Sequence, residues 1–189
     1  MDELIKSSLN EGEKILWKGG ADTIEALDKT NKKRFWITLV ICALTAVIIT
    51  VLYITNVKGE VKPGVIVIVW LLCAFAPVRR LLDASAVQKL QYLVTDQRLL
   101  IVSNDVKSVP LSRIRVSALR SDEDGHLSFL AGADALKTRP SHWRDLALTG
   151  RSGSAAEEDE AVDSFAFYAV SDKAGLRRAI RQVLPEVQE

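Results

Sequence analysis

An uninterrupted apolar run near the N-terminus is the feature that most constrains the fold of this chain. Residues 35–54 (FWITLVICALTAVIITVLYI) contain no charged side chain, and about 20 helical residues cover a hydrocarbon core of roughly 30 Å. A helix buried in a soluble protein would need a protein neighbour on every face. A cleaved signal peptide is a poor alternative, because a long charged segment precedes the run. We therefore expect a transmembrane helix.

A second apolar run follows after a short polar turn. Residues 65–78 read VIVIVWLLCAFAPV, and flanking residues extend this run to a span over 63–82. Its β-branched start would also suit a buried strand in water. A return helix is the simpler explanation directly after a spanning helix, because backbone polar groups in lipid must be paired within their own segment. The sequence thus predicts a transmembrane helical hairpin over residues 32–82.

Basic residues flank the outer ends of both spans and indicate the orientation of the hairpin. These membrane-flanking residues are Lys32, Lys33, Arg34, Arg79 and Arg80. The connecting loop holds fewer cations, Lys58 and Lys62, with Glu60 between them. Cytoplasmic loops of membrane proteins carry an excess of Lys and Arg. We expect the N-terminal segment 1–31 and the C-terminus to lie on the cytoplasmic side.

Composition argues against several functional classes. The 25 basic residues balance the 24 acidic ones, so no overall field favours binding to nucleic acid. Cys42 and Cys73 lie in apolar runs, where a thiol packs as a small hydrophobe, and His126 and His142 stand alone. The cluster 122–125 (DEDG) is superficially similar to a calcium loop, but it lacks the ligand spacing and favours a turn. We expect neither a metal nor another cofactor.

Residues 83–189 have the alternating pattern of a mainly β domain. Segments 90–95 and 98–103 have the spacing of a β-hairpin. Further strands are predicted over 114–118, 126–130 and 165–170. Around the first of these, Arg113 and Arg115 share the solvated face of an antiparallel strand.

The rest of this domain divides into a loop and a helix. Residues 132–163 are small, polar and acidic, so the default expectation is a flexible acidic loop. A helix is predicted from an N-cap at Ser171 to about Leu184. Its apolar stripe is Leu176, Ala179, Ile180, Val183 and Leu184, and its basic stripe is Lys173, Arg177 and Arg181. Such a helix closes the open end of a curved sheet.

Three motifs in this order resemble those of the bacterial pleckstrin-homology-like membrane proteins. They are residues 10–17 (NEGEKILW), 92–100 (YLVTDQRLL) and 109–114 (VPLSRI). The resemblance implies a mainly β, pleckstrin-homology-like barrel capped by the C-terminal helix and carried on the two-helix transmembrane hairpin. It also implies a multi-pass protein of the bacterial cytoplasmic (inner) membrane. Residues 132–163 depart from the family pattern in being long and acidic, which leaves the pairing of the later strands open.

The function that this resemblance implies is assembly or scaffolding rather than chemistry. We expect a non-catalytic interaction module that acts as a scaffold, assembly factor or accessory subunit of a membrane protein complex, with self-association as a further option. The sequence has no recognisable nucleophile–base pair or phosphate-binding glycine loop. The alternative is recognition of anionic lipid headgroups. Its candidate contact residues are Arg113, Arg115, Lys173, Arg177 and Arg181.

Overall fold

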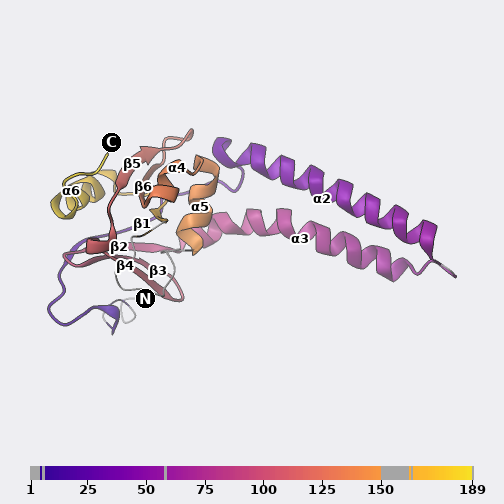
Figure 1. The fold of residues 1–189 in the computed structure, drawn as a ribbon, viewed down its shortest axis with the longest axis horizontal. Coiled ribbons are helices and arrows are strands. Elements are labelled where there is room, and N and C mark those ends of the chain that lie inside the picture. The colour runs from indigo at the N-terminus through magenta and orange to yellow at the C-terminus, as the bar shows by residue number, and fades with distance from the viewer. Residues whose placement is uncertain (1–4, 6, 58, 150–161, 163, 189) are drawn as a thin grey trace.

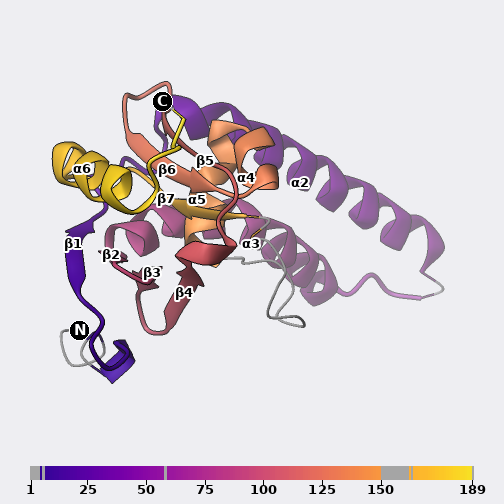
Figure 2. The ribbon, with the colours of Figure 1, turned by 60° about the vertical axis from the view of Figure 1, so that its left-hand side comes forward.

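Two long helices and a domain of two small sheets make up the chain (Figure 1). The computed structural model describes residues 5, 7–57, 59–149, 162 and 164–188. The helices α2 (Lys29–Asn56) and α3 (Pro63–Gln88) lie side by side and extend away from the sheets (Figure 2). The predicted hairpin is present in this arrangement.

Each helix of the hairpin is long and apolar enough to span a membrane. Only 6% of the most apolar window of either helix is buried in the protein, and Leu72 is 71% exposed. Such a surface suits lipid rather than water. Pro63 occupies the start of α3, where its missing N–H costs no hydrogen bond. Both helices run past the predicted spans of 35–54 and 63–82, so the expected domain boundary at residue 83 lies inside α3.

The first sheet contains four antiparallel strands in the order β1-β2-β3-β4. Their bounds are β1 (Ile15–Gly20), β2 (Gln91–Thr95), β3 (Arg98–Val102) and β4 (Val106–Pro110). The predicted hairpin around residues 96 and 97 is confirmed as β2 and β3. The prediction that residues 1–31 form a segment separate from the sheet domain is wrong. Strand β1 lies in this segment and pairs with β2, with Trp17 opposite Val94. The hairpin of long helices is therefore inserted between two strands of one sheet.

The second sheet contains three antiparallel strands in the order β5-β6-β7. They are β5 (Ser117–Ser121), β6 (Leu127–Ala131) and β7 (Phe165–Phe167). The strands of the two sheets do not close into a barrel among the residues that the structure describes. An isolated bridge between Ala21 and Val170 connects the ends of the sheets. Aromatic side chains, including Tyr92, Phe129 and Phe167, fill the core between them.

The expectation of a loop over residues 132–163 is wrong for its first half. This part forms α4 (Ala133–Lys137) and α5 (Pro140–Thr149). Trp143 is 2% exposed and Ala147 is fully buried, one helical turn apart, so this short amphipathic face anchors α5 to the core. The acidic residues 157–160 lie outside the described residues.

The predicted C-terminal helix is confirmed as α6 (Lys173–Val183). Leu176, Ala179 and Ile180 are buried against the end of the sheets. The N-cap is Asp172 rather than Ser171, and its carboxylate accepts hydrogen bonds from Gly175 N and Trp17 Nε1. A Cβ at Gly175 would collide with both of these side chains, which explains a glycine in the first turn.

Candidate functional site

A buried ion pair joins α5 to the start of α2. Arg144 Nη2 donates to Asp28 Oδ2 over 2.7 Å, and each side chain is only 4% exposed. Asp28 is also the N-cap of α2, because its carboxylate accepts hydrogen bonds from the backbone and side-chain nitrogens of Asn31. Removing one partner would leave a buried charge unpaired. The pair therefore fixes the sheet domain to the base of the hairpin.

A second carboxylate reaches the same helix end from the loop between β5 and β6. Asp124 accepts hydrogen bonds from Lys29 N, Thr30 N and Thr30 Oγ1 over 2.7–3.1 Å. Burial raises the pKa of Asp124, but the bonds from Thr30 and Lys29 outweigh it and hold the pKa below its ordinary value. Negative charge at a helix N-terminus is also favoured by the helix dipole. Arg144 of α5 and Asp124 of the loop between β5 and β6 thus both bind the N-terminal end of α2.

The turn predicted over residues 122–125 supplies this cap. Gly125 adopts a positive φ of 80° and donates its N–H to Asp122 O over 3.1 Å. Asp122, Asp124 and His126 place ligand-type atoms within 4.8 Å of one another. However, Asp122 Oδ2 accepts from Tyr168 OH at 3.1 Å and faces His126 Nδ1, while Asp124 caps α2. These groups have structural partners, which favours the turn interpretation over a calcium loop.

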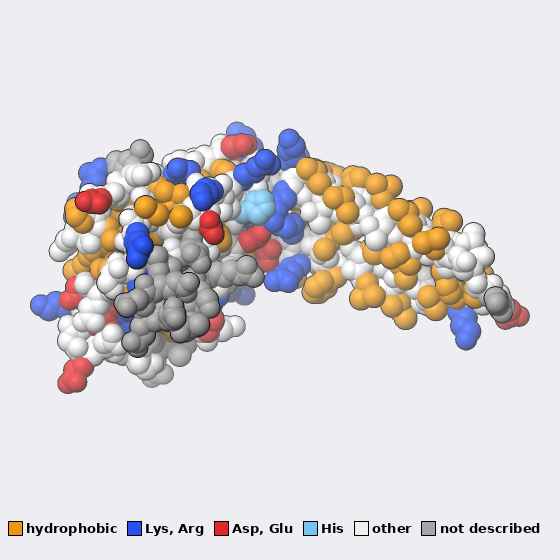
Figure 3. All heavy atoms as spheres, viewed as in Figure 1, with side chains coloured by type: hydrophobic (Ala, Val, Ile, Leu, Met, Phe, Trp, Pro, Cys, Tyr) orange, Lys and Arg blue, Asp and Glu red, His pale blue; other side chains and the backbone are white. Residues whose placement is uncertain are grey.

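Two of the five predicted membrane-flanking cations, Arg34 and Arg80, pair with one acid on α5. Arg34 Nη1 lies 2.7 Å from one carboxylate oxygen of Asp145, and Arg80 Nη1 lies 3.8 Å from the other. Both helices of the hairpin are therefore tied to α5 at their ends near the sheets. Lys32, Lys33 and Arg79 are exposed. Figure 3 shows basic side chains where the hydrophobic surface of the hairpin meets the sheet domain.

The other predicted contact residues lie elsewhere. Lys173, Arg177 and Arg181 are exposed on α6, which lies on the side of the domain away from the hairpin (Figures 1 and 2). Lys173 Nζ donates to Gly125 O over 2.8 Å. The prediction that Arg113 and Arg115 share one face of a strand is wrong. Arg113 belongs to the short helix η1 (Leu111–Arg113), and β5 begins only at Ser117. The motif over residues 109–114 (VPLSRI) ends in η1, where the chain passes from one sheet to the other.

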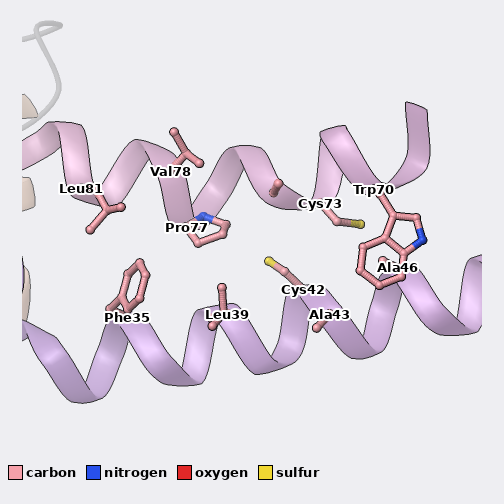
Figure 4. Close-up of a pocket in the computed structure, with 11 residues that line it drawn as sticks. Phe35, Leu39, Cys42, Ala43, Ala46, Trp70, Cys73, Pro77, Val78 and Leu81 are labelled. Atoms are coloured by element: carbon pink, nitrogen blue, oxygen red, sulfur yellow. The ribbon is translucent and has the colours of Figure 1, made fainter. Parts of the chain in front are cut away.

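An apolar groove separates the two helices of the hairpin (Figure 4). It has a volume of about 290 Å³. Cys42 and Cys73 face this groove as half-buried free thiols, in agreement with their prediction as small hydrophobes. Pro77 of α3 is buried against α2 nearby. Apart from the two thiols and the Trp70 indole, the residues that line the groove are apolar.

Sequence reasoning missed Asp28, Arg144 and Asp145, which organise the junction. The position of Asp28 before a long helix is a capping signal. The partner of Asp28 lies 116 residues away, and no local pattern indicates it. Comparisons with protein-family models, curated proteins and solved structures find no match for this chain.

Proposed function

We propose that this chain is a non-catalytic, membrane-anchored interaction module that presents a pleckstrin-homology-like domain to a protein partner at the cytoplasmic face of the bacterial inner membrane. The fixed junction between hairpin and sheet domain is the observation that supports this proposal. Asp28–Arg144 and Arg34–Asp145 hold the domain in one orientation relative to the helices. A flexible tether would leave the orientation of the domain free.

Three features support a pleckstrin-homology-like domain in particular. The motif over 10–17 ends in β1, the motif over 92–100 spans most of β2, the turn and the start of β3, and the motif over 109–114 runs from the end of β4 through η1. Antiparallel strands precede the terminal helix, and α6 packs its apolar stripe on the end of the sheets. The insertion of α4 and α5 before β7 accounts for the departure from the family pattern. In this interpretation, the two sheets correspond to an opened form of the expected barrel.

The basic stripe of α6 is the surface that we assign to the partner. With the hairpin in the membrane, α6 lies on the far side of the domain, so Lys173, Arg177 and Arg181 face the cytoplasm rather than lipid. Arg115 lies near the end of α6, beside Leu184 and Glu186. The position of α6 away from the hairpin favours an acidic protein surface over anionic lipid as the partner of these cations. The junction residues serve in capping and ion pairing, which supports a structural role rather than catalysis.

Site-specific photocrosslinking tests this function in native membranes. A photoreactive residue at Ala174, exposed beside the basic stripe, should give a discrete protein adduct. The triple variant Lys173→Glu, Arg177→Glu, Arg181→Glu should lose this adduct. A matched triple variant at exposed positions elsewhere, Lys14→Glu, Lys89→Glu and Lys137→Glu, should retain it.

Mass spectrometry of the adduct identifies the partner. A second copy of the chain would make the module self-associating, and another membrane protein would make it an accessory subunit. Crosslinking to lipid alone, or equal loss in both triple variants, would refute the proposed role of α6.

A further inference from the structure

A pocket of about 360 Å³ opens at the junction, next to the start of α2. Its walls come from three places that are distant in sequence: the first turns of α2, the loop between β5 and β6, and the N-terminal turn of α5. The side chains in its lining are those of Lys29, Thr30, Lys33, Arg34, Ile37, Glu123, Arg139, Pro140, Ser141 and His142. The pocket therefore forms only when hairpin and sheet domain are docked.

Positive charge dominates this pocket. Four cationic side chains line it against a single carboxylate, that of Glu123. Arg34 is already bound to Asp145 and to Ser141 O, but Lys29, Lys33 and Arg139 form no ion pair with any residue that the structure describes. Cations held together in a partly enclosed site repel one another, and a bound anion removes this repulsion.

The pKa of His142, which lines the same pocket, is lowered by this environment. Burial lowers its pKa, and the nearby Arg34 guanidinium lowers it further. The ring is therefore neutral at pH 7 and supplies hydrogen-bonding groups rather than charge. An anion bound in the pocket would raise the pKa of His142, which gives a spectroscopic signal of occupancy.

The membrane side of the pocket is apolar. Ile37 lines the pocket and is 50% exposed, and Ile41 and Leu44, each 58% exposed, continue the same face of α2 at helical spacing. Lys33, one turn before Ile37, begins this face. A ligand that fits both the cationic pocket and the apolar face of α2 has an anionic headgroup and hydrocarbon chains.

We propose that this pocket binds one anionic phospholipid, with its phosphate beside Lys33 and Arg139 and its acyl chains along Ile37, Ile41 and Leu44. The Glu123 carboxylate can accept a hydrogen bond from a headgroup hydroxyl, so phosphatidylglycerol fits better than a headgroup without a donor. Inorganic phosphate shares the charge chemistry but leaves the apolar face empty. This inference rests on the membrane insertion in the proposed function, but not on the partner of α6.

Native mass spectrometry of the full-length chain with phosphatidylglycerol tests the site. We expect one retained lipid per chain, and weaker retention of phosphatidylcholine. The double variant Lys33→Gln, Arg139→Gln should bind phosphatidylglycerol roughly 10- to 30-fold more weakly, because each cation near an anionic lipid strengthens binding several-fold. The matched control is Lys32→Gln, Arg79→Gln, which removes equal charge at exposed positions outside the pocket. In NMR titrations, phosphatidylglycerol should raise the pKa of His142 in the wild type and the control only.

Three outcomes would overturn the proposal. Equal weakening in both double variants would show a general effect of basic residues rather than a site. Equal retention of phosphatidylcholine would assign the binding to the apolar face alone. Displacement of the lipid by millimolar inorganic phosphate would identify free phosphate as the ligand. The Ala174 crosslink should persist in the Lys33→Gln, Arg139→Gln variant, so failure of this site is distinguishable from failure of the proposed function.

Discussion

Arg144 and Asp28 form an ion pair of 2.7 Å in which each side chain is 4% exposed. The pair links the N-cap of α2, a helix long and apolar enough to span a membrane, to α5 of the sheet domain. The Arg144 guanidinium also lies over the Tyr168 ring, 5.9 Å from its centroid, and Tyr168 OH donates to the buried Asp122. Asp122 belongs to the turn that supplies Asp124 to the same helix end. The junction is thus one connected polar network.

Arg144→Ala should destabilise the protein strongly. The substitution leaves the Asp28 carboxylate buried without its cation, which typically costs about 3–5 kcal/mol. Chemical denaturation of the full chain in detergent measures this change. Arg178→Ala, which removes an exposed arginine on α6, should change the free energy of unfolding by less than about 0.5 kcal/mol. Similar values for the two variants would contradict the structural role of the ion pair.

The pairing of Glu13 with Arg98 predicts loss of stability in acid. The Arg98 side chain is only 17% exposed, and its Nη2 lies 2.9 Å from the buried Glu13 carboxylate. Burial raises the pKa of Glu13, but hydrogen bonds from Arg98, Thr95 and Asn10 outweigh it, so the folded pKa lies below the ordinary value of 4.5.

The sign of the pH effect follows from this lowered pKa. The stabilisation is complete above pH 4.5 and is lost as the pH falls through the folded pKa of Glu13. Glu13→Gln should therefore lower stability at pH 7 and reduce its dependence on pH below 4.5. Thermal melting of both proteins between pH 3 and 7 measures this difference. An unchanged acid slope in the variant would exclude Glu13 as the responsible group.

The sequence predicted those elements whose signal is local. The apolar runs of α2 and α3, the hairpin of β2 and β3 and the stripe of α6 each depend on spacing within one segment. The strand β1 was missed because its partner β2 follows the whole helical hairpin. The helix α5 was missed because its short apolar face, which includes Trp143 and Ala147, lies within a segment of mainly small and polar residues.

The candidate site was predictable only in part. The membrane-flanking cations were identified from their positions beside the spans. Their grouping with Arg139, His142 and Asp145 depends on how α5 docks, which no spacing along the chain indicates. Charge patterns thus singled out cations beside the apolar runs, but they did not indicate the pocket that Lys33 and Arg34 line.

Cysteine labelling measures the orientation of the hairpin. In a chain without Cys42 and Cys73, Asn56→Cys lies at the far end of α2, and Lys137→Cys is exposed on the sheet domain. A membrane-impermeant maleimide added to intact bacteria should label Asn56→Cys and miss Lys137→Cys, because basic residues flank the other end of the hairpin. Permeabilised cells should show labelling at both positions. Labelling of Lys137→Cys alone in intact cells would reverse the topology.

The C-terminal helix should be indispensable for the sheet domain. Leu176 is fully buried, and truncating a buried leucine typically costs about 2–5 kcal/mol. A small domain has a total stability of only about 5–15 kcal/mol, so Leu176→Ala combined with Ile180→Ala should abolish cooperative melting. Arg178→Ala changes an exposed position of the same helix and serves as the control. Near-UV circular dichroism follows the melting, since Trp17 packs on the start of α6 through its bond to Asp172. A cooperative transition that survives in the double variant would show that α6 is an appendage and that the two sheets form a stable core without it.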